Sequence, residues 1–105
     1  GHGWRKLLRH PKSLSYRIHT LPPIPAVLSF IQSQARLDNA DAYGTLNMGA
    51  GFALFVHKEV AHQVVAVAKA QGVSAWVAGE IEAGPKRGVI EPLGVEFGGD
   101  SLALR

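Results

Sequence analysis

The sequence contains no cysteine, so it offers no disulfide bond, thiol nucleophile or thiolate metal site. It also lacks an apolar run of the roughly 18–20 residues that a membrane-spanning helix needs. The longest apolar stretches, 50–56 and 73–78, have the length of strands. No apolar run near the start is followed by a small-residue cleavage site, so we expect no signal peptide. These absences favour a cytoplasmic protein that contacts no membrane.

Acidic residues are absent from residues 1–37, which carry six lysines and arginines. Residues 38–105 carry all eight acidic residues against five basic ones, so the two parts have formal charges of +6 and −3. The basic part is typical of a surface that meets a phosphate-bearing partner, and equally of a solvated basic face. Only Trp4 and Tyr16 are interleaved with these charges, so no nucleic acid is expected as a partner.

The length and composition predict one small globular domain that covers residues 1–105. Hydrophobic periodicity and turn residues predict the following main elements: a strand at 14–19, a helix at 25–36, a short helix or turn at 38–43, a buried strand at 52–56, a helix at 58–71, and strands at 74–81 and 89–91. This order predicts an α+β fold, a layered α/β sandwich with partial ferredoxin-like topology. Residues 93–105 are expected to form a C-terminal hairpin extension, with 95–97 paired to 102–104.

Finer features of the pattern give further expectations. Residues 4–9 can form a short helical turn that ends before Pro11, since the residue preceding a proline is pushed out of the helical region. The helix at 58–71 is expected to end at Gly72 in the left-handed conformation. Its inner stripe consists of Val60, Val64, Val67 and Ala68. Trp76 is interpreted as a core residue rather than a stacking platform.

Motifs for nucleotide binding or nucleophilic catalysis are missing from the sequence. There is no dinucleotide fingerprint, phosphate-binding loop or nucleophile elbow, and the spread of the five histidines predicts no metal site. His57 and His62, for example, are five residues apart and do not share a helix face. The polar loop with Thr45 and Asn47 is the better site, because a hydroxyl and an amide suit recognition of a sugar or an amide group. The alternative is that these two side chains only cap local backbone.

Two stretches carry a family resemblance: Tyr-Gly-Thr-Leu-Asn-Met-Gly-Ala-Gly-Phe at 43–52 and Ala-Trp-Val-Ala-Gly-Glu at 75–80. With 25–32, 70–72 and 89–91, they resemble the C-terminal domain of phosphoribosylformylglycinamidine cyclo-ligase, also called aminoimidazole ribonucleotide synthetase, from about Leu21 to Glu91. Gly1-His2-Gly3 matches the family's glycine-rich loop, although that loop is ordinarily Gly-Gly-Gly followed by Leu. The chain is therefore expected to begin inside this loop and to lack the N-terminal side of the domain.

The resemblance implies part of a homodimeric, two-domain, ATP-dependent ligase of purine biosynthesis. That enzyme converts formylglycinamidine ribonucleotide to aminoimidazole ribonucleotide. ATP and Mg²⁺ are implied for the parent enzyme and no cofactor for this chain, which is expected to be inactive alone. The implied substrate-binding residues are Gly1, His2, Gly3, Arg5 and Lys6 near the phosphate of the phosphoribosyl substrate, and Thr45, Asn47 and Gly49 at the cleft between domains. No catalytic residue and no metal ligand is assigned.

Two other functions stay open at this point. The chain could be a stand-alone, non-catalytic binding or oligomerisation module of the same fold. A domain without its early strands has open sheet edges, which pair readily with a second copy and predict a homo-oligomer. The third interpretation is a sister enzyme of the same fold, such as a selenophosphate or thiamine-phosphate kinase or a hydrogenase maturation factor. The two stretches above favour the cyclo-ligase over these.

Overall fold

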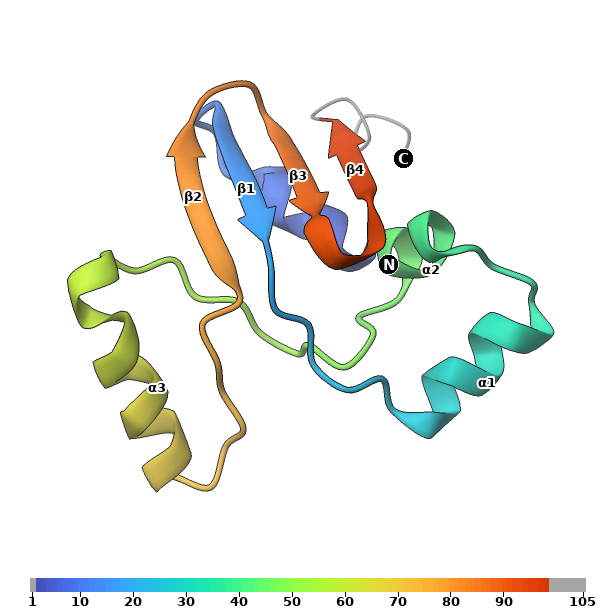
Figure 1. Cartoon of the computed structure of the whole chain (residues 1–105), viewed down its shortest axis with the longest axis horizontal. Helices are drawn as coiled ribbons and strands as arrows, with labels where there is room; N and C mark the ends of the chain where they lie inside the picture. Colours follow the sequence, from blue (N-terminus) through green and yellow to red (C-terminus); the bar gives the residue numbers. More distant parts are fainter. Residues whose placement is uncertain (1, 99–105) are drawn as a thin grey trace.

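Four strands form one mixed sheet in the computed structural model of the chain, which describes residues 2–98 (Figure 1). The sheet order is β2-β1-β3-β4. The strands are β1 (Leu14–Ile18), β2 (Gly79–Ala83), β3 (Arg87–Ile90) and β4 (Val95–Gly98). The central strands β1 and β3 are parallel, and each edge strand is antiparallel to its neighbour. The α+β class predicted from the sequence is confirmed.

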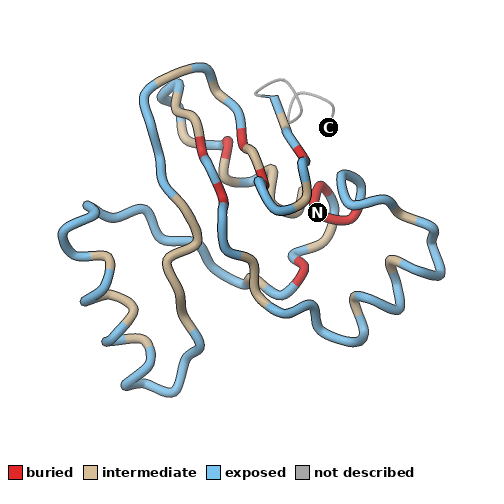
Figure 2. The backbone as a smooth tube through the Cα atoms, in the orientation of Figure 1, coloured by how far each residue is buried: buried red, intermediate tan, exposed pale blue. Residues whose placement is uncertain are grey.

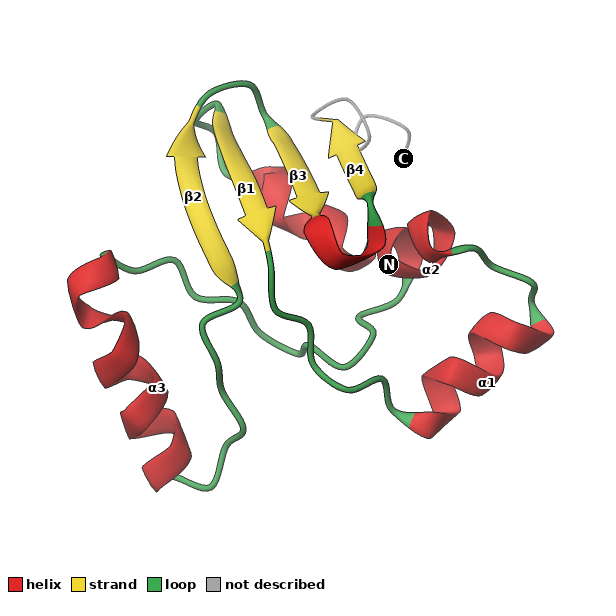
Figure 3. Cartoon of the chain, viewed as in Figure 1, coloured by secondary structure: helices red, strands yellow, loops and turns green. Residues whose placement is uncertain are grey.

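The helices of the described residues are short (Figure 3). Three are α-helices: α1 (Ala26–Gln34), α2 (Asn39–Thr45) and α3 (Ala61–Ala70). Three are 3-10 helices: η1 (Gly3–Arg9), η2 (Lys58–Val60) and η3 (Glu91–Leu93). No helix within residues 2–98 is long and apolar enough to span a bilayer.

Local signals in the sequence explain where these helices begin and end. The carboxylate of Asp38 accepts a hydrogen bond from the backbone N–H of Asp41 at 2.8 Å and so caps the start of α2. Beyond the end of α3, Gly72 has a φ of +79°, the left-handed conformation expected there. The helices predicted at 4–9, 25–36, 38–43 and 58–71 are confirmed, the last as η2 followed by α3.

The core lies between one face of the sheet and the layer formed by η1 and α2 (Figure 2). Because side chains alternate along a strand, Tyr16 and Ile18 of β1 point toward this side. Ile90 of β3 and Val95 of β4 are buried there as well. The opposing layer, with the loop that follows α2, buries four apolar residues: Leu8, Ala42, Tyr43 and Met48. Gly88 on β3 lies beneath Leu8, since a Cβ at position 88 would be only 3.8 Å from Cδ2 of that leucine.

Charged side chains alternate with the buried ones along the strands, and Arg17 is at the centre of an ion-pair network. Its guanidinium pairs with Glu80 and lies 3.4 Å from Glu82 and 4.0 Å from Glu91. The hydrogen bond from Arg17 to Glu80, with the surrounding carboxylates, raises the pKa of Arg17. All these side chains are substantially exposed, so solvent screens the network and its contribution to stability is small.

One predicted strand is wrong, because residues 52–56 form no strand and are exposed throughout. Among residues 2–98 these five make no backbone hydrogen bond. The apolar run has strand character, but β1 and β3 each already pair on both sides and leave it no place in the sheet centre. Within the described chain, this segment makes one ring contact, in which the centroids of Phe55 and Tyr16 are 5.5 Å apart.

Strand β2 is shorter than predicted, because residues 74–78 lie outside it. The last link of this segment to β1 is the carbonyl of Ala78, which accepts from His19 and Thr20 at 2.9 and 3.1 Å. Further pairing is prevented because the chain after Thr20 enters the proline-rich stretch 21–25, and proline has no N–H to donate. Trp76 is half-buried and donates from Nε1 to the Thr20 carbonyl at 3.0 Å, a structural role.

At the other edge of the sheet, β4 pairs with β3. The expected partner of this strand at 102–104 lies outside the described residues, so the hairpin extension stays a prediction.

Helices α1 and α3 lie beyond the sheet and cover neither of its faces (Figures 1 and 2). Neither helix contains a buried residue. The predicted inner stripe of α3 does occupy one side of the helix, but Val67 is 65% exposed.

Candidate functional site

The N-terminal segment and the end of α2 lie side by side, so the structure brings together the two parts of the sequence that carry the predicted site residues. Trp4 donates from Nε1 to the Asn47 carbonyl at 2.7 Å. Arg5 donates from Nε to the Gly44 carbonyl at 2.8 Å. The rings of Trp4 and Tyr43 meet edge to face with centroids 5.4 Å apart. These three contacts fix η1 against α2 and the loop that follows it.

Gly3 makes this close approach possible. Its φ is +52°, and a Cβ at this position would lie 2.3 Å from the Tyr43 carbonyl oxygen and 2.8 Å from that of Leu46. Such distances exclude any side chain, since both neighbours are backbone atoms. Gly3, which matches part of the family's glycine-rich loop, is therefore required for packing.

The loop after α2 is held mainly by its own backbone. The Asn47 side-chain oxygen accepts from the Gly49 N–H at 2.9 Å, and the Asn47 carbonyl accepts from Ala50 at 3.0 Å. Gly49 has a φ of +101°, and a Cβ there would lie 2.9 Å from the Pro23 carbonyl oxygen. Asn47 thus has the local capping role that the sequence left open as an alternative. Thr45 ends α2 with an exposed side chain.

The exposed surface of η1 is basic. Lys6 and Arg9 are both exposed, and the Arg9 Nη2 lies 3.4 Å from Nδ1 of His2. Sequence reasoning named His2 and Lys6 but not Arg9. The signal that could have found Arg9 is its spacing of three from Lys6, because residues i and i+3 align in a 3-10 helix. Gly1, the remaining residue of the predicted set, lies outside the described residues.

Tyr43 lies beneath Trp4 and is 2% exposed. Burial raises the pKa of the Tyr43 phenol, so it stays protonated at neutral pH. The role of the Tyr43 ring is to support the indole of Trp4, which in turn contacts the 45–51 loop.

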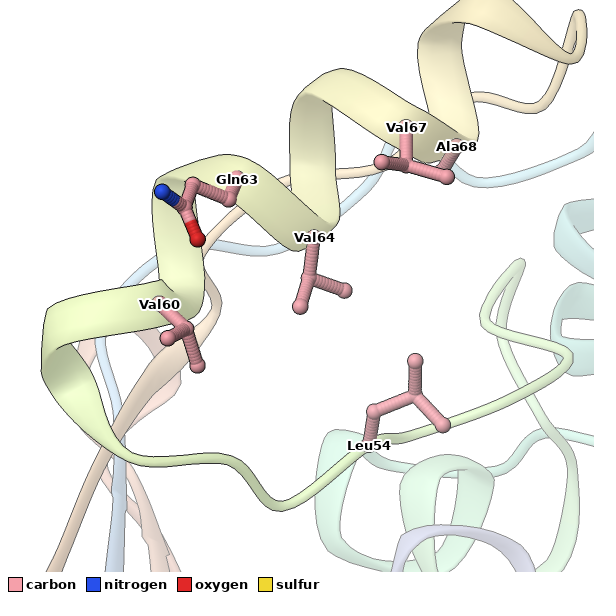
Figure 4. Close-up of a pocket in the computed structure, with 6 residues that line it drawn as sticks. All are labelled: Leu54, Val60, Gln63, Val64, Val67 and Ala68. Carbon is pink, nitrogen blue, oxygen red and sulfur yellow. The ribbon is translucent and has the colours of Figure 1, made fainter.

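A hollow lies between α3 and the extended segment 52–56 (Figure 4). It is an open apolar groove of about 420 Å³, lined by Leu54, Val60, Gln63, Val64, Val67 and Ala68. These lining residues include no titratable side chain, so the groove offers no acid–base chemistry. Throughout residues 2–98, no three histidine, aspartate or glutamate side chains gather closely enough to hold a metal ion.

Comparison with known proteins decides the family. The family described as "AIR synthase related protein, C-terminal domain" matches residues 11–91. The chain belongs to this family. The match to the AIR synthase related C-terminal domain starts ten residues before Leu21, where the resemblance of the sequence began. It includes Thr45, Asn47 and Gly49, whereas the predicted residues on η1 precede it.

Curated relatives in this family are named phosphoribosylformylglycinamidine cyclo-ligase. The Methanococcus vannielii protein is 38% identical over 82 residues, which are 78% of this chain and 24% of the relative. The Bacillus subtilis protein is 34% identical over 94 residues, 89% of this chain and 25% of the relative. The Pseudothermotoga lettingae protein is 33% identical over 81 residues, 76% and 24% of the two chains. The chain spans about a quarter of the length of these relatives.

Proposed function

We propose that this chain acts as the C-terminal part of an ATP-dependent phosphoribosylformylglycinamidine cyclo-ligase of purine biosynthesis, working in the cytoplasm. The observation that carries the proposal is the family match over residues 11–91, together with relatives that bear this name. The substrate would be formylglycinamidine ribonucleotide and the product aminoimidazole ribonucleotide. In this function the chain would work next to the remaining three-quarters of such an enzyme, as a homodimer.

In this proposal, the residues of the chain bind and orient the phosphoribosyl substrate. Gly1, His2, Gly3, Arg5 and Lys6 would lie toward its phosphate, and Thr45, Asn47 and Gly49 would border the cleft between domains. ATP, with Mg²⁺, would activate the formyl amide oxygen for displacement during ring closure. No three histidine, aspartate or glutamate side chains gather within residues 2–98, so the ligands of Mg²⁺ would come from the rest of such an enzyme. We expect the chain alone to be inactive.

A chimera tests this proposal directly. The matching quarter of the Bacillus subtilis cyclo-ligase is replaced by this chain, and the product is expressed in bacteria that need added purine because they lack the enzyme. Growth without purine, with ATP-dependent product from the purified chimera, would support the proposal. The unmodified relative is the positive control, and the relative without the matching quarter is the negative control. A stable, well-folded chimera with no activity would contradict the proposal.

The second candidate function is a stand-alone oligomerisation module. It is favoured by the outer edges of β2 and β4, which pair with no further strand among residues 2–98, and by the exposed apolar side of α3. Sedimentation equilibrium of the 105-residue chain separates the two functions. A defined dimer that forms at micromolar concentration, with an inactive chimera, would favour the module. A chain that stays monomeric at millimolar concentration would exclude it.

A further inference from the structure

We propose that residues 52–56 pair with the same residues of a second copy of this chain as an antiparallel β-ribbon, with α3 of each copy against one face of the ribbon. The inference names the surface through which the chain associates with itself. It does not rest on cyclo-ligase activity.

The backbone of residues 52–56 is available for such pairing. The segment is exposed, and it makes no backbone hydrogen bond within residues 2–98. Phe52, Phe55 and Val56 belong to the aromatic and β-branched residue types that are enriched in strands. A row of unpaired N–H and C=O groups on an extended apolar segment is a template for another strand.

Both faces of the segment are apolar. Because side chains alternate along an extended chain, Phe52, Leu54 and Val56 share one face. Leu54 points across the groove toward α3, so this face is turned toward the apolar side of the helix (Figure 4). Phe55 lies on the other face, where its ring contacts Tyr16. A second strand beside the first would therefore be covered on one face by the two α3 helices.

The segment is also self-complementary. An antiparallel pair centred on Leu54 has a two-fold axis, so each copy uses the same surface. In this register the two Leu54 side chains lie opposite each other, and Phe52 of each copy lies beside Val56 of the other. The second strand would bring its own apolar side chains to the open groove of about 420 Å³.

The exposed apolar area is sufficient for a dimer. Six large apolar side chains of this surface are between 38% and 96% exposed: Phe52, Leu54, Phe55, Val56, Val60 and Val67. They offer about 600 Å² on each copy, since a fully exposed side chain of this size has roughly 150–200 Å² of surface. Two copies would bury about 1,200 Å² before the backbone is counted, which is the lower end of specific interfaces.

The outer edges of the sheet are poorer sites for a second copy. Strand β2 carries Glu80 and Glu82, and pairing with itself would bring the carboxylates of two copies together. Strand β4 has four residues and carries Glu96. Residues 52–56 carry no charge, so no such repulsion opposes their pairing.

The test combines sedimentation equilibrium with amide hydrogen exchange of the 105-residue chain. We expect a defined dimer at micromolar concentration. Alternate amides within residues 52–56 should become protected as concentration rises, because every second residue of an antiparallel strand directs its N–H toward the partner. The amides of β2 and β4 should show no such dependence on concentration.

Leu54→Lys should weaken dimerisation about tenfold or more, because it places two ammonium groups opposite each other. Leu54 is 70% exposed, so the variant should keep the fold of the single chain, which urea unfolding verifies. The matched control is Phe30→Lys on α1, a residue that is 63% exposed. This control should dimerise like the unaltered chain.

A mixture of charge variants tests the register of the ribbon. Leu54→Lys and Leu54→Glu should each be monomeric alone at concentrations where the unaltered chain is a dimer. Mixed in equal amounts, they should form a heterodimer, because opposite charges then face each other across the two-fold axis. Failure of the mixture to associate would contradict this register.

Other results would overturn the proposal. These are a monomer at millimolar concentration, or equal weakening by Leu54→Lys and Phe30→Lys. Concentration-dependent protection in β2 or β4 instead of 52–56 would overturn the pairing and leave the stand-alone module standing. Protection of 52–56 in the chimera but not in the chain alone would assign this surface to the rest of the enzyme and overturn it as well. An inactive chimera, with a chain that dimerises through 52–56, would contradict the proposed function and leave this inference intact.

Discussion

Two regions of the molecule have similar apolar sequence patterns but differ in solvent exposure. One is the sheet with η1 and α2, and the other is residues 52–70. In the first, Leu8 is 1% exposed and Ile90 is 2% exposed. In the second, Phe52 is 96% exposed and Leu54 is 70% exposed. Both regions have the apolar pattern of a buried element, so the pattern alone does not decide burial. What differs is whether the opposing apolar surface packs closely enough to exclude solvent, since Leu54 faces α3 only across an open groove.

The two regions also differ in backbone hydrogen bonding. Each central strand has partners on both sides, and η1 is joined to α2 and its following loop by Trp4 and Arg5. Residues 52–56 have no such partner within the described chain. We therefore expect the free energy of unfolding to depend on the sheet and its covering layer, and very little on α3 and the segment before it.

The largest effect is expected at the contact between β1 and β2. Gly79→Ala would place a Cβ 1.9 Å from the Arg17 carbonyl oxygen, a backbone atom that cannot move without breaking the pairing. We expect a loss of about 3 kcal/mol in the free energy of unfolding, measured by urea denaturation. Gly51→Ala is the control, because a Cβ there meets no atom within 4 Å. Equal losses in the two variants would refute the division.

A smaller loss is expected from truncating the core side chain that covers β3. Leu8→Ala should cost about 2.5 kcal/mol, the transfer term plus the cavity left beneath η1. Val67→Ala, on the exposed side of α3, should change stability by less than about 0.5 kcal/mol. The pair is compared by thermal and urea unfolding. A Val67→Ala loss as large as that of Leu8→Ala would mean that the α3 region is part of the cooperative core.

The smallest change concerns Tyr16, which is 2% exposed and whose hydroxyl has no hydrogen-bond partner within the described residues. Tyr16→Phe removes this unsatisfied group and should raise the free energy of unfolding by about 1 kcal/mol at neutral pH, measured by urea denaturation. A loss of stability in this variant would show that the hydroxyl is satisfied in solution.

The pH dependence of Tyr16 follows from the same burial, which raises its pKa in the folded state. Above the unfolded value of about 10, the unfolded chain releases a proton that the folded chain retains, so stability falls as pH rises. Tyr16→Phe should flatten this alkaline loss of stability above about pH 10, measured by urea denaturation at a series of pH values. An unchanged slope would show that Tyr16 is hydrated in solution.

The sequence was sufficient where a local signal sets the structure. The stretch 38–43 was predicted as a short helix or turn, Gly72 as the end of the helix at 58–71, and the alternation at 14–19 as a strand. It was insufficient where a distant partner decides, as at residues 52–56, which have the composition of a buried strand but no neighbour to pair with within the described chain.

Among the site residues, too, the sequence was insufficient where the local structure had to be known. Asn47 was ambiguous from the sequence, since only the placement of Gly49 showed which group its amide oxygen binds. Arg9 was missed because its alignment with Lys6 depends on a 3-10 rather than an α-helical turn.

The exposed run 50–56 has one more consequence, for the behaviour of the chain at high concentration. Its seven residues include no charge, no proline and only one glycine, and four of the last five are large and apolar. These are the properties of segments that stack into cross-β fibrils with dry, interdigitated sheets. His57 and Lys58 directly follow the run, and a charge at this border is the usual natural safeguard against such stacking. Lys58→Gln, which removes the charge of the lysine at this border, should therefore speed fibril growth.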